Sequence, residues 1–338
     1  MSLSVEQRKT LEAERADLVS RLGEIDALLR SATSDVIPDD TSWVLLSSTG
    51  LLGRWESAEI SLTGPRTTHD VITSAIRTPG IFGVITNQGR IIQAKSSELP
   101  QVASGLTTPN LQGGILAGNF IALAAGEKAL ALTTLTSQTY GWALGTRNGI
   151  VKRTNPEIPK GDEPFEIIRL EAGDEVVGAC ELQHEHRQLV FITDDGKLLH
   201  YPAASVRPQG RAGGGIVGIK LELRTQVVFF GAGNLASDLV ATNAGRTTAI
   251  ASESAGSLKV TPLDAFPTKG RATGGVRCHR FLKGEDTLYS GWVGAAPAIA
   301  ATKTGSPSNL PQIDPRRDGS GTPASLRVSG IGSRKLEL

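Results

Sequence analysis

The first part of the chain has the apolar spacing of one amphipathic helix. Apolar residues recur seven positions apart at Leu11, Leu18 and Ile25, with further leucines interleaved between them. This spacing places them on one helix face, and Glu, Arg and Ala favour helix at the other positions. A lone helix of this length is marginal in water, so its stripe needs a partner. We therefore predict a helix within residues 1–32, followed by a polar linker over 33–42.

From residue 43 the pattern changes to short apolar runs separated by turns. One motif, Ser/Thr-x-x-Gly between two apolar runs, occurs six times: Ser47–Gly50, Thr86–Gly89, Thr146–Gly149, Thr193–Gly196, Thr242–Gly245 and Thr302–Gly305. Two short strands joined by a glycine turn form a β-hairpin. Six hairpins, each in a unit of about four strands, are typical of a propeller. We predict an all-β fold with six blades over 43–324, a thin last blade and a flexible tail at 325–338.

Two further elements recur between the hairpins. The glycine-rich loop Gly210–Gly215 is echoed at Gly270–Gly275. A glycine followed by acidic residues precedes a strand at Gly126-Glu127, and again at Gly173–Glu175 and Gly284–Asp286. The elements keep the same order in successive units, which indicates true structural repeats.

Composition narrows the class of protein. The two cysteines, Cys180 and Cys278, exclude a disulfide framework and a four-sulfur zinc site, which favours a reducing compartment. No stretch has the pattern of a signal peptide or a membrane span, so we expect a cytoplasmic protein with no membrane partner. The net charge of +1 is uneven, because residues 1–40 hold 5 Lys/Arg and 9 Asp/Glu and the remainder holds 30 and 25.

Most of the basic residues singled out follow the hairpin glycines or lie in the loops between hairpins. Lys303 lies just before its hairpin glycine, and Lys259 follows a further turn at Gly256. The hairpin set is Arg54, Arg90, Lys152, Arg153, Lys197, Arg246, Lys259 and Lys303, and the loop set is Arg66, Arg207, Arg211, Lys269, Arg271, Arg277 and Arg280. A base at the same place in each blade recurs at the same height on the perimeter. We therefore predict a basic belt that binds a rod-like polyanion, with duplex DNA favoured because aromatic stacking groups are scarce. The alternative interpretation is that these bases are solvated surface.

Two segments resemble a known repeat. Thr146–Thr154 reads Thr-Arg-Asn-Gly-Ile-Val-Lys-Arg-Thr, and 269–276 reads Lys-Gly-Arg-Ala-Thr-Gly-Gly-Val. Both look like the C-terminal domain of the A subunits of bacterial type IIA topoisomerases, and the helix before residue 32 is similar to the coiled-coil arm that leads into that domain. The resemblance implies a six-bladed β-pinwheel, with strands exchanged between neighbouring blades, that bends duplex DNA around its rim to capture the segment to be transported.

The same resemblance implies partners and cofactors for the parent enzyme. The partners are a homodimer formed through the rest of the A subunit, and an ATPase B subunit that completes a heterotetramer. The cofactors are ATP, bound by that B subunit, and Mg²⁺, and the implied location is nucleoid-associated. This chain itself is expected to bind no cofactor and no metal.

The catalytic tyrosine of that family has no counterpart in this chain. Tyr140, Tyr201 and Tyr289 lie at or beside strand patterns and are interpreted as packing residues. The chain alone should therefore not cleave DNA.

One departure distinguishes two branches of that family. Gyrase A subunits carry a Gln-Arg-Arg-Gly-Gly-Lys-Gly box after the first hairpin, where this chain reads Thr63-Gly64-Pro65-Arg66-Thr67-Thr68-His69. Because the box is absent, the resemblance favours the topoisomerase IV type, which relaxes and unlinks DNA. Two alternatives stay open, namely a gyrase domain that wraps DNA for negative supercoiling and a propeller scaffold that binds proteins.

Three other patterns resemble functional sites, but each lacks a feature that such a site requires. Gly231-Ala232-Gly233 follows a strand, as in dinucleotide-binding proteins, but the next strand starts too soon for the helix that would hold a pyrophosphate. The pair His184 and His186 lacks assigned further metal ligands. Cys278 and His279 are adjacent in a strand pattern, so their side chains point to opposite faces.

Overall fold

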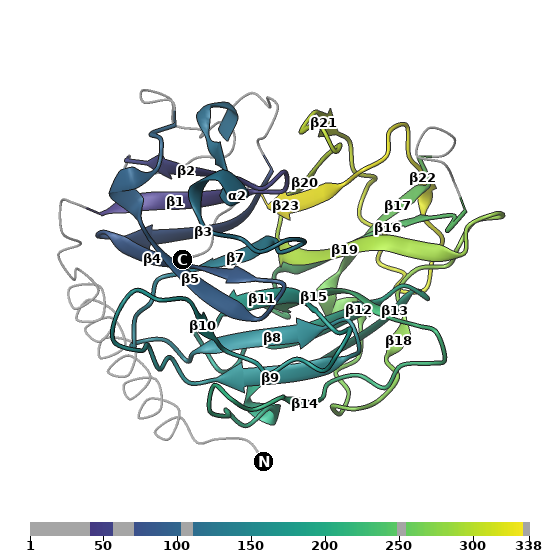
Figure 1. Ribbon diagram of the computed structural model, residues 1–338. Coiled ribbons are helices and arrows are strands. Elements are labelled where there is room, and N and C mark those ends of the chain that lie inside the picture. The colour runs from purple at the N-terminus through teal and green to yellow at the C-terminus, as the bar shows by residue number, and fades with distance from the viewer. Residues whose placement is uncertain (1–40, 57–70, 103–110, 249–254, 334–338) are drawn as a thin grey trace, which may run out of the picture. The chain divides into compact units, whose positions relative to one another are not determined.

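The computed structural model describes residues 41–56, 71–102, 111–248 and 255–333 (Figure 1). The predicted helix within 1–32, most of the predicted linker, Arg66 and the segment 63–69 lie outside the described residues. A compact unit begins at Ser42, the first residue of the first strand.

The first sheet shows how each blade is built. β1 (Ser42–Ser47) and β2 (Leu51–Trp55) form an antiparallel hairpin. β3 (Ile72–Thr78) pairs with the other edge of β1, and β6 (Ile115–Leu116) pairs with β2. The strand order is therefore β3-β1-β2-β6, with the hairpin in the middle of the sheet.

Four more four-stranded sheets and one three-stranded sheet repeat this plan. The second sheet is β10 (Phe165–Glu166), β5 (Arg90–Lys95), β4 (Ile81–Thr86) and β7 (Ala129–Thr133). The third is β11 (Val176–Glu181), β8 (Trp142–Thr146), β9 (Ile150–Thr154) and β14 (Ile216–Val217). The fourth is β15 (Val227–Gly233), β12 (Gln188–Thr193), β13 (Lys197–Pro202) and β18 (Val276–Arg277). The fifth is β19 (Thr287–Ala295), β16 (Asp238–Gly245), β17 (Ser257–Pro262) and β22 (Thr322–Pro323), and the sixth is β21 (Pro307–Ser308), β20 (Ala298–Ala301) and β23 (Gly330–Ser333).

The outer strand of each of the first five sheets comes from the following repeat. β6, for example, follows the hairpin of the second sheet in sequence but pairs with the hairpin of the first. β10, β14, β18 and β22 repeat this exchange one blade further on each time. The predicted six-bladed propeller with exchanged strands is confirmed.

The inner strands meet around the middle of the ring. Successive contacts join β3, β7, β11, β15, β19 and β23, and β23 contacts β3 to close the circle (Figure 1). The prediction of a flexible tail over 325–338 was wrong for its described part, because Gly330–Ser333 forms β23 and Val328 is buried. The thin last blade was predicted correctly, since it has three strands.

The recurring Ser/Thr-x-x-Gly motif has a local physical cause. In the third blade Gly149 N–H donates to the Thr146 carbonyl at 3.0 Å, and Thr146 Oγ1 accepts from Ile150 N–H at 3.2 Å. Gly149 has φ +82°, a conformation that glycine adopts at little cost. The fifth hairpin differs from the prediction, because β16 runs through Gly245 and the left-handed glycine before β17 is Gly256.

Short helices connect the strands within the described residues. They are α2 (Ala117–Phe120) and the 3-10 turns η1 (Ser96–Glu98), η2 (Leu111–Gly113), η3 (Ala203–Ser205) and η4 (Leu263–Ala265). The apolar core lies between neighbouring sheets, where Phe191, Tyr201 and Phe230 pack together between blades three and four. Hairpin strands are consequently buried along most of their length, as the uniformly buried β12 shows.

Candidate nucleic-acid interface

The segments that lead to the exchanged strands run along the outer edges of the blades. In blade three this segment, residues 207–215, lies against β9, where Lys152 Nζ donates to the carbonyls of Arg211 and Gly213 at 2.7 Å each. In blade two, Gln93 Nε2 donates to the Gly161 carbonyl at 2.9 Å. In blade five, Lys259 Nζ donates to the Arg317 carbonyl at 3.1 Å. Side chains of the hairpin thus hold these segments, here called the rim loops, in place.

Two predicted belt residues therefore point inward. Lys152 is 0% exposed and Lys259 is 2% exposed, so neither ammonium group reaches the surface. Burial lowers the pKa of Lys152 to about 8 and also lowers that of Lys259. The prediction that they belong to a surface belt was wrong. The exchanged strand and its rim loop, which come from the following repeat, cover the outer edge of each hairpin and bury these side chains.

Arg153 is a third correction. Its guanidinium is 2% exposed and donates to the carbonyls of Ala203 and Val206, at 3.0 and 3.3 Å, and to the Glu185 carboxylate at 2.9 Å. The side chain therefore anchors the connection after the fourth hairpin to the third blade.

Bases at the starts of the hairpin strands are mostly neutralised. Arg90 donates from Nε to Glu127 at 2.7 Å, which raises the pKa of Arg90. Lys197 lies 2.9 Å from an Asp195 carboxylate oxygen, and Arg54 pairs with Glu56 at 3.1 Å. Arg246 and Lys303 are exposed at their turns. These positions supply little free positive charge outside the last two hairpins.

Exposed cations gather instead on blades three and four. The predicted residues Arg207, Lys269, Arg277 and Arg280 are exposed there, and Arg211 and Arg271 are half-buried. Arg211 lies over the Phe165 ring at 5.6 Å from its centroid, and Arg271 donates to the Val217 carbonyl. Prediction missed the exposed Lys220, Arg224 and Lys283, which follow the exchanged strands β14 and β18. Their position shortly after the glycine-rich loops Gly210–Gly215 and Gly270–Gly275 was the available signal.

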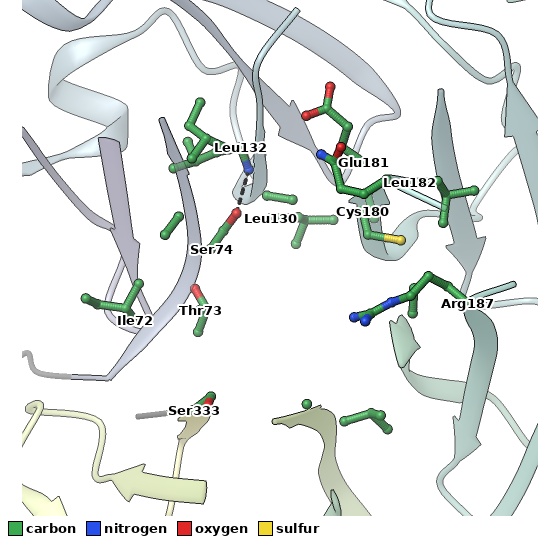
Figure 2. A pocket seen from close by; sticks show the side chains of 18 of the residues that line it. Ile72, Thr73, Ser74, Leu130, Leu132, Cys180, Glu181, Leu182, Arg187 and Ser333 are labelled. Atoms are coloured by element: carbon green, nitrogen blue, oxygen red, sulfur yellow. Dashed lines mark hydrogen bonds between the residues drawn. The ribbon is translucent and has the colours of Figure 1, made fainter. Parts of the chain in front are cut away.

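A cavity of about 490 Å³ lies among the inner strands, lined by residues of β3, β7, β11 and β19 (Figure 2). Arg187 points into it, and Ser74 Oγ accepts a 2.9 Å hydrogen bond from Leu132 N–H. The Glu181 carboxylate accepts hydrogen bonds from Thr133 and Thr134, and burial raises the pKa of the Cys180 thiol to about 12. The Glu181 carboxylate is thus occupied by hydrogen bonds, and the Cys180 thiol is not activated.

The tyrosines and the other weak patterns show no catalytic arrangement in the described part of the chain. Tyr201 is fully buried, and burial raises its pKa. Tyr289 Oη donates to the Arg246 carbonyl, whereas Tyr140 is 47% exposed and is not the packing residue we predicted. Gly233 ends β15 and is followed by a turn and β16, without a helix. Across the described residues no three His, Cys, Asp or Glu side chains converge on a metal position.

Comparisons with known proteins match parts of the chain to one class of β-propeller. A family model described as the DNA gyrase C-terminal domain, beta-propeller, matches residues 187–225 and 254–288. The matched segments contain the hairpin of blade four and the rim loops of blades three and four.

The proteins similar in sequence include DNA gyrase A subunits and a topoisomerase subunit. The DNA gyrase A subunit of Helicobacter pylori strain J99 is 28% identical over 214 residues, which cover 58% of this chain and 25% of that protein. The topoisomerase subunit TopoM of Mycolicibacterium smegmatis is 29% identical over 177 residues, covering 52% and 23%. The DNA gyrase A subunit of Aminobacterium colombiense is 27% identical over 292 residues, covering 81% and 33%. The chain thus spans a third or less of the length of each of these relatives.

Two solved structures share the fold. The crystal structure of the C-terminal domain of DNA topoisomerase IV has a TM-score of 0.66 at 19% identity, covering 86% of this chain and 92% of that one. A DNA gyrase A C-terminal domain has a TM-score of 0.58 at 15% identity, covering 86% and 99%. These structures show the fold, and the sequence matches support similarity to the C-terminal domains of type IIA topoisomerase A subunits. No helix among its described residues is long and apolar enough to span a membrane.

Proposed function

We propose that this chain binds and bends duplex DNA and that it is the C-terminal domain of a topoisomerase IV-type A subunit. The observation that carries the proposal is the run of exposed cations on the rim loops of blades three and four. Five Lys/Arg and no carboxylate lie between Lys269 and Lys283, and three Lys/Arg and no carboxylate lie between Arg207 and Lys220. Charges of one sign on neighbouring blades form a continuous surface for a polyanion.

The ligand that fits this surface best is a duplex. Phosphates follow one another along the DNA at a regular spacing, and each Lys or Arg that meets one releases counterions. Single-strand binding relies on aromatic side chains that stack on bases. Among the described residues Tyr140 is the one strongly exposed Phe, Tyr or Trp, and it lies in the connection between β7 and β8 rather than on a rim loop.

The topoisomerase IV assignment rests on the sequence of the first repeat. The segment 63–69 has one arginine and no lysine, where gyrase A subunits have a glycine-rich basic box. Without that box we expect the domain to bend a duplex and present it for transport by the parent enzyme. That enzyme would comprise the A-subunit homodimer and the ATPase B subunit, use ATP and Mg²⁺, and act in the bacterial cytoplasm at the nucleoid.

The test is duplex binding by fluorescence anisotropy over a series of salt concentrations, with the double variant Lys269→Glu/Arg277→Glu. If both side chains meet phosphates, the slope of log affinity against log salt should decrease by about 2, at roughly 0.9 per contact. The matched control is Lys95→Glu, which reverses an exposed base on blade two. An unchanged slope in the folded double variant would reject these contacts. Failure of the unaltered protein to bind at low salt would favour the protein-scaffold alternative.

A further inference from the structure

The rim loop of blade two carries the opposite charge to those of blades three and four. Residues 155–166 contain one cation, Lys160, and four carboxylates, Glu157, Asp162, Glu163 and Glu166. All five side chains are exposed. No ion pair joins these carboxylates to other residues within the described chain.

This acidic loop occupies the same place on its blade as the basic loops do on theirs. β10 pairs with β5 in the register Phe165↔Ile91, just as β14 pairs with β9 in the register Ile216↔Val151. The loops of blades two and three are each fixed by a hairpin side chain that donates to a loop carbonyl. Carboxylates on blade two therefore stand where guanidinium and ammonium groups stand on the next two blades.

At the boundary between blades four and five the basic surface also ends. On the rim loop of blade five, Arg316 Nε lies 3.0 Å from an Asp314 carboxylate oxygen. Arg280, at the edge of blade four, lies 3.9 Å from an Asp318 carboxylate oxygen. Residues 314–318 have two cations and two carboxylates, so this loop has no net charge.

We propose that the duplex contacts only the arc formed by blades three and four, and that the acidic loop of blade two directs it off the rim. This inference rests on the proposed function and adds where the DNA path ends. Carboxylates repel phosphates over roughly a Debye length, about 8 Å at physiological salt. A duplex that follows two neighbouring blades is bent, but it does not encircle the domain.

The experiment adds positive charge to the acidic loop with Asp162→Lys/Glu163→Lys and maps hydroxyl-radical protection on a linear duplex. Both side chains are exposed and neither forms a hydrogen bond among the described residues, so the variant should fold, which circular dichroism checks. The protected stretch should lengthen at one end, and the salt slope should become steeper by about 2. The control is Glu98→Lys in η1, beyond the end of β5 that is farthest from the hairpin turn, and it should leave the footprint unchanged.

The outcomes separate the two proposals. If the unaltered protein binds and the double lysine variant has the same footprint and slope, the acidic loop does not end the path and this inference fails while the proposed function stands. If the unaltered protein already protects DNA over a length that needs all six blades, the short arc is wrong. If the unaltered protein does not bind DNA, the proposed function itself fails.

Discussion

The ammonium group of Lys152 donates a 2.7 Å hydrogen bond to the main-chain carbonyl of Arg211, a residue 59 positions later in the chain. Lys259 makes the equivalent contact with the Arg317 carbonyl in blade five. The contact joins a hairpin to the rim loop that the next repeat contributes. Basic residues of the hairpins thus position the loops, and the loops carry the exposed charge.

Replacing Lys152 should separate these two roles. Lys152→Met keeps the apolar stem but leaves two loop carbonyls without a donor, which should cost about 1–3 kcal/mol of unfolding free energy. Lys152→Glu places a carboxylate against the same carbonyls and should cost more. Urea denaturation measures both, and the DNA affinity of the folded methionine variant should equal that of the unaltered protein. A stable methionine variant with a reduced salt slope would show that Lys152 contacts DNA, which contradicts its assignment to loop positioning.

Acid should destabilise the domain through His279. This side chain is buried between Thr242 Oγ1 at 2.8 Å and Ser257 Oγ at 3.2 Å, and burial, with a contribution from Lys259, lowers its pKa to about 4. Between about pH 6.5 and pH 4 the imidazole of His279 is protonated in the unfolded chain but not in the folded chain. Its contribution to the unfolding free energy is therefore full above about pH 6.5 and decreases as the pH falls through this window.

The loss from His279 should reach roughly 3 kcal/mol at the bottom of the window. Burial also lowers the pKa of His200, which acts in the same direction. Denaturation by urea at pH 7.5, 6 and 5 measures the effect, and His279→Gln should show a shallower dependence on pH. An equal dependence in both proteins would rule out His279 as its source.

Glu127 should be a main stabilising residue of blade two. Burial raises its pKa, but hydrogen bonds from Arg90, Thr86 Oγ1 and Ala124 N–H outweigh burial and lower it to about 2. Its contribution is therefore present above about pH 4.5 and is lost as the pH falls towards 2. Glu127→Gln should lower the unfolding free energy at neutral pH by about 2–3 kcal/mol, because Arg90 loses its counter-ion. A change below about 0.5 kcal/mol would show that the pair behaves as an exposed ion pair.

The contact between the inner strands of blades three and four should not tolerate a methyl group at Gly178. A Cβ there would lie 2.0 Å from the Phe230 carbonyl oxygen, which is main chain and cannot rotate away. We expect Gly178→Ala to destabilise the domain by more than about 3 kcal/mol. At Gly210 a Cβ meets no atom within 4 Å, so Gly210→Ala is the control and should change stability by less than about 1 kcal/mol. Similar melting temperatures for both variants would contradict the close packing.

The features that the sequence predicted correctly are local. A hydroxyl and a glycine three residues apart close a turn by themselves, so the motif at Thr146–Gly149 predicts a hairpin without knowledge of its neighbours. The strand exchange was expected only from the family resemblance, because a two-residue strand such as Ile216–Val217 has no pattern of its own. β23 was missed for the same reason, since Gly-Ile-Gly-Ser lacks a strand signal.

The rim could be predicted only in part. The glycine-rich loops pointed to Lys269 and Arg277, which are exposed. The position after a hairpin glycine pointed equally to Lys152 and Lys259, which are buried. Whether a hairpin base reaches the surface depends on the strand that a later repeat lays against it, and that strand lies dozens of residues away in sequence.

Ligation of nicked circular DNA in the presence of increasing protein measures whether the duplex wraps the whole rim or only bends over two blades. After the protein is removed, the sealed circles are separated by linking number, and a companion gel shows binding at the same concentrations. A duplex bent over two blades should be bound without a change in the mean linking number, because a bend that does not encircle the domain stores no fixed writhe. A shift of constant sign that grows with bound protein would mean that the DNA wraps the whole rim, and would contradict the account.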